Sequence, residues 1–146
     1  MLEFREITLE DVDRVLEIEE ECFSTPWKRE DFEKMVTDPH KTYIMAVKDS
    51  YIIGGAGLQE IVGEGEITNV AISNEYRGNG YSKPMIEALL SKGKEMGCEA
   101  FTLEVRVSNE PAIKLYRSVG FEDSGIRPGF YQHPKEDALI MWNRKC

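Results

Sequence analysis

The chain has 146 residues, of which 41% are hydrophobic and 31% are charged, a composition that belongs to a folded globular protein and excludes a largely disordered one. A chain of this length buries the core of one domain, so we expect a single domain over residues 1–146. The net charge of −9 disfavours direct binding to the phosphate backbone of a nucleic acid.

The charges and cysteines disfavour further classes of protein. The start of the chain carries charges too early and too often for a secretory leader, and no apolar run approaches the roughly 18 residues of a membrane span. The cysteines, Cys22, Cys98 and Cys146, are odd in number and form no CxxC pair, which argues against a disulfide framework and a zinc site. We therefore expect a cytoplasmic protein that holds no metal and binds no membrane.

The first segments of the chain predict one strand and two helices. Residues 2–8 alternate between apolar and polar side chains, as a half-buried strand does. Residues 9–21 predict an amphipathic helix whose apolar stripe consists of Val12, Val15, Leu16 and Ile18. Pro26 is well placed to open a second, short helix that runs through Val36.

The middle of the chain predicts a hairpin, a further strand and a longer helix. Residues 42–62 contain two strand-like runs joined by a tight turn at residues 48–50, and residues 65–73 form another strand. Residues 82–96 place apolar side chains at helical spacing, and Gly97 ends this helix.

The last segments complete the expected fold. Residues 100–107 predict a strand, residues 109–120 a short helix with an asparagine cap and a glycine stop, and residues 120–127 and 138–143 two final strands. Strands that alternate with helices indicate an α/β (α+β) fold with helices on both faces of the sheet. The hairpin makes that sheet mixed rather than purely parallel.

Residues 74–85, NEYRGNGYSKPM, lie between a strand and a helix and have the composition of an anion site. The N–H groups at a helix start lack helical partners, and the helix dipole adds roughly half a positive charge there. Gly78 and Gly80 let the backbone approach a ligand closely, and Arg77 and Lys83 add positive charge. The pattern favours a pyrophosphate cradle; the alternative is a plain surface turn.

Two common phosphate-binding motifs fit this loop poorly. The P-loop pattern, GxxxxGK followed by Ser or Thr, is absent. The dinucleotide fingerprint GxGxxG matches Gly78 and Gly80, but Lys83 stands in place of its third glycine and the unit lies in mid-chain beside a hairpin.

Residues 69–90, NVAISNEYRGNGYSKPMIEALL, and 103–121, LEVRVSNEPAIKLYRSVGF, resemble the acetyl-CoA-binding core of the GNAT N-acetyltransferase family. Residues 77–82 fill the family loop, Q/R-x-x-G-x-G/A, with Ser82 where glycine or alanine is usual and Pro84 following where alanine is common. The resemblance implies a GNAT-like, largely antiparallel mixed sheet of about seven strands. It also implies acetyl-CoA as the co-substrate.

The resemblance further implies which residues meet the cofactor. In GNAT proteins the main chain of the strand before the loop binds the pantetheine arm, which corresponds here to Val70, Ala71 and Ile72. The loop takes the pyrophosphate, which corresponds to Arg77, Gly78, Asn79, Gly80, Tyr81, Ser82 and Lys83. Asn109 is expected both to cap its helix and to contact the cofactor.

Transfer from a thioester to an amine also needs groups that move protons. Glu104 matches the family's glutamate base, although its pattern alone also fits a solvated strand face. Tyr116 matches the tyrosine that protonates the departing thiolate, although a helical tyrosine is by pattern more often a packing residue. We expect direct transfer without an acetyl-enzyme or a metal, and an oxyanion held by the N–H of Val70.

The segments ECFSTPW (21–27) and GIRPGFY (125–131) resemble those family members that acetylate the N-terminal alanine of a ribosomal protein. The acceptor wall then consists of Phe23, Pro26, Trp27 and Tyr131, although Phe23 and Trp27 fit core packing almost equally well. We expect a basic ribosomal protein as partner of a monomer or weak dimer. A lysine side chain or small-molecule amine as acceptor, and a non-catalytic acetyl-CoA-binding module, remain alternatives.

Overall fold

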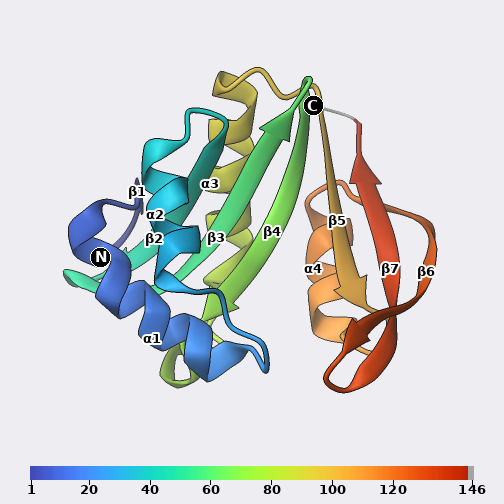
Figure 1. The fold of residues 1–146 in the computed structure, drawn as a ribbon, viewed down its shortest axis with the longest axis horizontal. Helices are drawn as coiled ribbons and strands as arrows, with labels where there is room; N and C mark the ends of the chain where they lie inside the picture. The colour runs from blue at the N-terminus through green and yellow to red at the C-terminus, as the bar shows by residue number, and fades with distance from the viewer. Residues whose placement is uncertain (145–146) are drawn as a thin grey trace.

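One mixed sheet forms the middle of the molecule, and helices cover both of its faces (Figure 1). The computed structural model describes residues 1–144, so Cys146 lies outside the described residues. Within them the sheet has seven strands in the order β1-β2-β3-β4-β5-β7-β6. The strands are β1 (Leu2–Glu6), β2 (Lys41–Lys48), β3 (Tyr51–Ile61), β4 (Glu64–Ile72), β5 (Ala100–Arg106), β6 (Glu122–Gln132) and β7 (Lys135–Asn143). Of the described pairs only β4–β5 is parallel, which confirms the mixed, largely antiparallel sheet.

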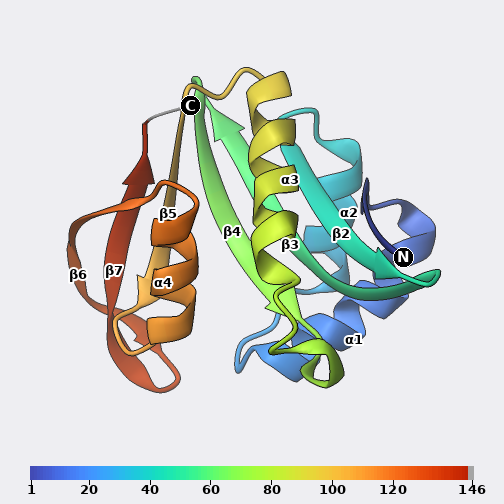
Figure 2. The ribbon, with the colours of Figure 1, turned by 180° about the vertical axis from the view of Figure 1, so that it is seen from behind.

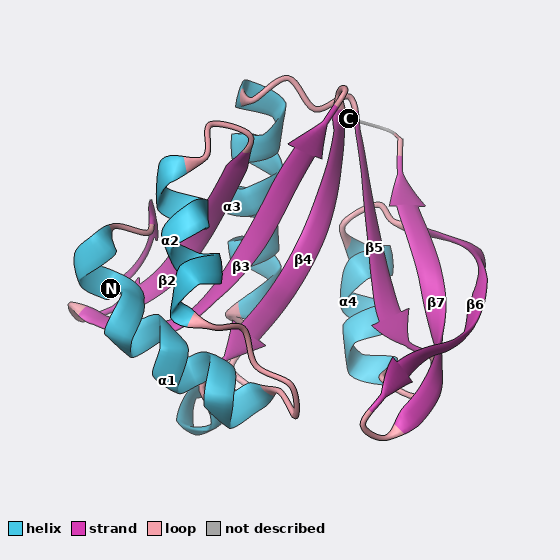
Figure 3. Ribbon diagram, in the orientation of Figure 1, coloured by secondary structure: helices cyan, strands magenta, loops and turns pink. Residues whose placement is uncertain are grey.

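The helices form two layers. The helices α1 (Val12–Cys22) and α2 (Arg29–Thr37) lie on one face of the sheet, and α3 (Ser82–Glu95) and α4 (Glu110–Ser118) lie on the other (Figure 2). The loops that join strands to helices gather at the two ends of the sheet (Figure 3). None of the helices in the described part of the chain is both long and apolar enough to span a membrane.

The side chains of the central strands alternate between two hydrophobic cores. Along β2, Tyr43 and Met45 are buried in the core on the face that α1 and α2 cover, whereas Ile44 and Ala46 are buried in the core on the other face, where α3 packs against β2. Successive residues of a strand point to opposite faces, so a strand that is apolar throughout needs a cover on both. This confirms the expected helices on both faces.

Helix α2 begins later than the sequence predicted. We expected Pro26 to open it, but its first residue is Arg29, so that expectation is wrong. The N–H of Lys28 donates to the carboxylate of Asp31 at 2.9 Å. This side-chain cap sets the start of the helix, and Pro26 stays in the preceding loop.

The last two strands are longer than the predicted ranges 120–127 and 138–143. Pro128, which follows the predicted range of the first of them, lies inside β6. Because β6 is the outermost strand and its register shifts between Arg127 and Tyr131, it tolerates a residue that cannot donate to a ladder.

Strands β4 and β5 separate along their length and leave an opening in the sheet (Figure 1). Their parallel pairing joins only Glu64–Glu66 to Ala100–Thr102. Strand β4 also carries a bulge, because Gly57 of β3 faces two of its residues, Thr68 and Asn69. Beyond the short parallel pairing, the edge of β4 that faces β5 has no strand partner among the described residues.

Candidate active site

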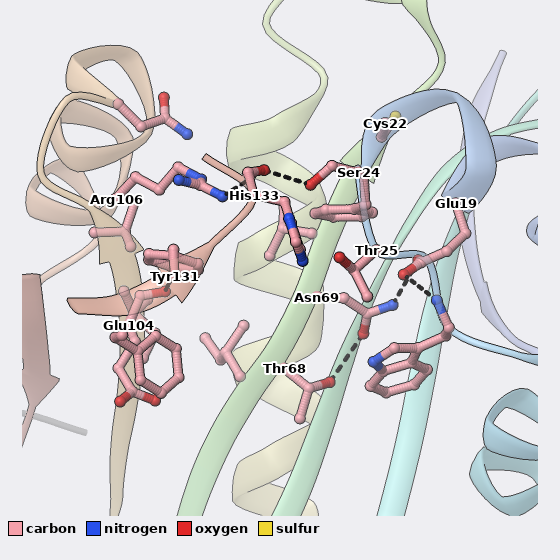
Figure 4. A pocket seen from close by; sticks show the side chains of 18 of the residues that line it. Glu19, Cys22, Ser24, Thr25, Thr68, Asn69, Glu104, Arg106, Tyr131 and His133 are labelled. Atoms are coloured by element: carbon pink, nitrogen blue, oxygen red, sulfur yellow. Dashed lines mark hydrogen bonds between the residues drawn. The ribbon is translucent and has the colours of Figure 1, made fainter. Parts of the chain in front are cut away.

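A cavity of about 840 Å³ lies where β4 and β5 diverge. Its walls come from α1, the α1–α2 loop, β4, β5, α4 and the β6–β7 hairpin (Figure 4). Seven of the residues singled out in the sequence line it: Phe23, Trp27, Val70, Glu104, Asn109, Tyr116 and Tyr131. Segments from both ends of the chain therefore meet in one site.

The other predicted site residues lie outside this cavity. Pro26 is not part of its lining. The side chains of Ala71 and Ile72 are buried in the two cores, so these residues can meet a ligand only through their main chain. Residues 77–83 lie beyond the end of β4, at the start of α3 (Figure 2).

Glu104 faces the cavity because it alternates with apolar neighbours on β5. Leu103 and Val105 are buried in the core under α3 and α4. The Glu104 side chain is 19% exposed, and its Oε2 lies 2.9 Å from Nη1 of Arg127 on β6. No described N–H is directed at this buried oxygen in hydrogen-bonding geometry. The carboxylate is therefore largely buried and held by one ion pair, unlike a residue on a solvated strand face.

Tyr116 is held in α4 with its ring in the core, 5.9 Å from the ring of Phe121. Burial raises the pKa of its phenol above the usual value, so the group is neutral at neutral pH. No hydrogen bond joins its hydroxyl to any described residue, which leaves the hydroxyl available to a ligand. Asn109 caps the same helix by accepting the N–H of Ala112 at 3.3 Å, so the predicted cap is confirmed.

The loop before α3 presents unpaired N–H groups. Gly78 and Gly80 have φ values of +80° and +76°, and a Cβ at either would meet nothing within 4 Å. None of the described residues accepts a hydrogen bond from the N–H groups of residues 78–81. The Asn79 side chain closes the loop by donating to the carbonyl of Tyr76 at 3.0 Å. Together with the start of α3, which has no side-chain cap, the loop suits an anion.

The two cations of the loop behave differently. Arg77 donates from Nε to the carbonyl of Ile72 at 3.0 Å, and its Nη2 lies 3.0 Å from Sγ of Cys22. Its side chain thus anchors the loop to the end of β4 and to α1. Lys83 has no ion-pair partner among the described residues, so its charge remains available at the first turn of α3.

Glu19 is a site residue that the sequence interpretation missed. It is 2% exposed and lines the cavity. Its Oε2 accepts the N–H of Trp27 at 3.1 Å, and its Oε1 accepts Nδ2 of Asn69 at 3.0 Å. Glu19 follows Val15 by four residues, so a charge on the apolar stripe of α1 was the available signal.

The α1–α2 loop and the β6–β7 hairpin meet across the cavity. The hydroxyl of Ser24 donates to the carbonyl of His133 at 2.7 Å (Figure 4). Tyr131 donates its hydroxyl to the main-chain carbonyl of Glu104 at 3.1 Å, and its ring lies 4.4 Å from the guanidinium of Arg106. These contacts fix one wall of the cavity.

Phe23 and Trp27 line the cavity and also pack against the core under α1 and α2. The ring of Trp27 lies 5.2 Å from that of Phe32. Core packing and a place in the cavity wall are therefore compatible for both residues.

In the described part of the chain, no group of three or more His, Cys, Asp or Glu side chains is placed to hold a metal ion.

A sheet opened between two parallel strands, a carboxylate and a neutral phenol in the opening, and an anion site at a helix start make the framework of an N-acetyltransferase. The chain belongs to the acetyltransferase (GNAT) family, whose family model matches residues 12–121. It is accordingly an acetyl-CoA-dependent enzyme.

The similarity to known proteins extends over nearly the whole chain. A Bacillus subtilis (strain 168) protein, provisionally named ribosomal protein bS18-alanine N-acetyltransferase, is 38% identical over 139 residues, which are 94% of this chain and 92% of that protein. A Haemophilus influenzae protein named ribosomal protein bS18-alanine N-acetyltransferase is 32% identical over 136 residues, 90% of each chain. The crystal structure of the ribosomal-protein-S18-alanine N-acetyltransferase from Escherichia coli has a TM-score of 0.88 and 26% identity, covering 98% of this chain and 93% of that one.

Proposed function

We propose that the protein transfers the acetyl group of acetyl-CoA to the α-amine of an N-terminal alanine, on a ribosomal protein with a basic N-terminal tail. The observation that carries the reaction is that Glu104 and Tyr116 line the same cavity at the opening of the sheet. Relatives named for alanine acetylation of a ribosomal protein support the choice of acceptor. We place the reaction in the cytoplasm, where ribosomal proteins are made.

Acetyl-CoA binds along the free edge of β4. The main chain of Val70, Ala71 and Ile72 hydrogen-bonds the pantetheine arm, and Asn109 contacts it from the start of α4. The N–H groups of residues 78–83 take the pyrophosphate, with help from the helix dipole and from Lys83. The unpaired N–H groups and the open space beside Gly78 and Gly80 support this assignment.

Proton transfers at two residues accompany the reaction. Glu104 takes a proton from the α-ammonium through water, and the amine nitrogen bonds to the acetyl carbon. The N–H of Val70 stabilises the charge that develops on the carbonyl oxygen. The carbon–sulfur bond breaks, Tyr116 gives its proton to the sulfur, and solvent restores both residues.

The α-amine suits this site better than a lysine side chain does. An α-ammonium has a pKa of about 8, whereas a lysine ammonium has a pKa of about 10.4. At neutral pH a lysine would therefore need a much stronger deprotonating environment. Phe23, Trp27 and Tyr131 form the acceptor wall.

Replacement of Gly80 should weaken the binding of acetyl-CoA. Valine is strained at a φ of +76° and prevents close approach of the loop to the pyrophosphate. Gly80→Val should raise the Kd for acetyl-CoA about tenfold or more, or about 1.4 kcal/mol, in isothermal titration calorimetry.

Gly97→Val is the matched control. Gly97 has a φ of +96°, and a Cβ there, as at Gly80, would meet nothing within 4 Å, but Gly97 lies at the other end of α3. The control should be strained in the same way and keep the parental Kd. An unchanged Kd in folded Gly80→Val would remove the loop from the cofactor site.

Peptides that begin with alanine and carry arginine or lysine at the next positions should be acetylated. The net charge of −9 favours a basic tail. Their apparent affinity should fall as salt is raised, because exposed charge pairs are screened beyond about 10 Å at ~0.1 M ionic strength. Mass spectrometry of a peptide panel that varies the first residue measures the preference.

The same peptides with a blocked α-amine are the control. Blocking should abolish the reaction even when lysines remain, because only the α-amine reaches the reactive position. Modification of the blocked peptide at a similar rate would place the enzyme among acetyltransferases of side-chain amines instead.

A further inference from the structure

A buried carboxylate that the proposed reaction does not use lies in the wall of the cavity. Glu19 is buried on the apolar side of α1. Burial raises the pKa of this carboxyl, and the hydrogen bonds from Trp27 and Asn69 oppose the rise. A charged form is costly to bury, so a carboxylate at this position needs a role that an apolar residue could not fill.

The hydrogen bonds of Glu19 join two parts of the cavity (Figure 4). One comes from Trp27 in the α1–α2 loop, and the other from Asn69 in the bulge of β4. Thr68 donates in turn to Oδ1 of Asn69 at 2.9 Å, so both side chains of the bulge are held. Gly57 leaves room for them, because a Cβ there would lie 2.5 Å from Oδ1 of Asn69 and from Oγ1 of Thr68.

We infer that Glu19 is a positioning residue that fixes the α1–α2 loop relative to the β4 bulge, and thereby the acceptor amine relative to the acetyl group. The inference rests on the proposed function, in which the loop contacts the acceptor and Val70, next to the bulge, supplies the oxyanion N–H. A misplacement of about 1 Å can cost about 10² in rate. Transfer to the acceptor, and not binding of acetyl-CoA, therefore depends on Glu19.

Glu19→Gln tests this link with little change of shape. A glutamine oxygen can still accept one of the two donors, but its NH₂ group faces the other donor, so one hydrogen bond is lost. The variant should lower kcat/KM for the acceptor peptide about tenfold or more and leave the Kd for acetyl-CoA within about twofold.

The double variant Glu19→Gln with Asn69→Asp restores the hydrogen bond between positions 19 and 69, with the donor and the acceptor exchanged. The new glutamine NH₂ donates to the new aspartate, the glutamine oxygen accepts the N–H of Trp27, and the net charge is unchanged. This variant should recover kcat/KM to within about threefold of the parent, as expected for two residues coupled through one contact. Asn69→Asp alone places two carboxylates together, so its kcat/KM should stay well below that of the parent.

Tryptophan fluorescence gives a readout that does not depend on turnover. The chain has two tryptophans, so a Trp142→Phe background leaves Trp27 alone in the α1–α2 loop. Glu19→Gln should shift its emission to longer wavelength and increase quenching by acrylamide, and the double variant should reverse both changes.

Unchanged kinetics and emission in Glu19→Gln, or a double variant that recovers neither, would overturn the positioning role. A parent protein that fails to acetylate alanine-first peptides would instead overturn the proposed acceptor. The fluorescence comparison would still decide whether Glu19 holds the loop.

Discussion

Glu104→Gln should lower kcat by about 10²-fold or more and leave the Kd for acetyl-CoA within about twofold. The amide keeps the shape of the carboxylate but cannot take the proton of the ammonium. The substitution removes the negative charge that pairs with Arg127. Because the Arg127 side chain is 56% exposed, the fold should lose little stability. Steady-state kinetics with an alanine-first peptide and calorimetry with acetyl-CoA measure the two quantities.

Glu66→Gln is the matched control for this variant. Glu66 lies opposite Thr102 where β4 and β5 are still paired, and it does not line the cavity. It should turn over at the parental rate. If Glu104→Gln also kept that rate while chemistry limits turnover, Glu104 would not be the base.

The strand that carries Glu104 and the helix that carries Tyr116 could be predicted from short-range periodicity, whereas the roles of the two residues were implied only by the resemblance to the family. Glu104 alternates with buried residues along β5, and this alternation of side chains is visible in the sequence as well as in the strand. Tyr116 lies seven residues after Asn109, which is about two turns of α4. The asparagine cap is a local signal of the same kind.

Glu19 could not be placed in this way because its partners are far along the chain. Trp27 is 8 residues away and Asn69 is 50 residues away. No local pattern states which loop N–H and which strand amide a helical glutamate will reach. The bulge that presents Asn69 likewise depends on how β3 and β4 pair.

The misplaced element boundaries have a related cause. Pro26 suits a helix start, but a cap between Lys28 and Asp31 sets the start of α2 instead. Pro128 suits the end of a strand, but β6 continues past it because it lies at the edge of the sheet. In both places a contact or a neighbouring strand outweighs the preference of one residue.

Tyr116→Phe should also lower kcat by about 10²-fold, through the loss of one oxygen atom. The ring can keep its packing against Phe121 at 5.9 Å, and the hydroxyl has no hydrogen-bond partner among the described residues, so stability should hardly change. Burial raises the pKa of this phenol, so it stays protonated wherever the α-amine reacts. The rate loss should therefore be the same from about pH 6 to about pH 9.

A donor with a better leaving group separates proton donation from packing. If Tyr116 protonates the departing sulfur, an acetyl thioester whose thiol has a lower pKa needs less help, and the loss caused by Tyr116→Phe should shrink with that donor. Tyr43→Phe is the control, because it also removes a buried phenol oxygen, from a ring that packs against Phe32 and does not line the cavity. It should leave kcat at the parental value. An equal loss with both donors, or a similar loss in Tyr43→Phe, would mean that Tyr116 supports the core and not the transfer.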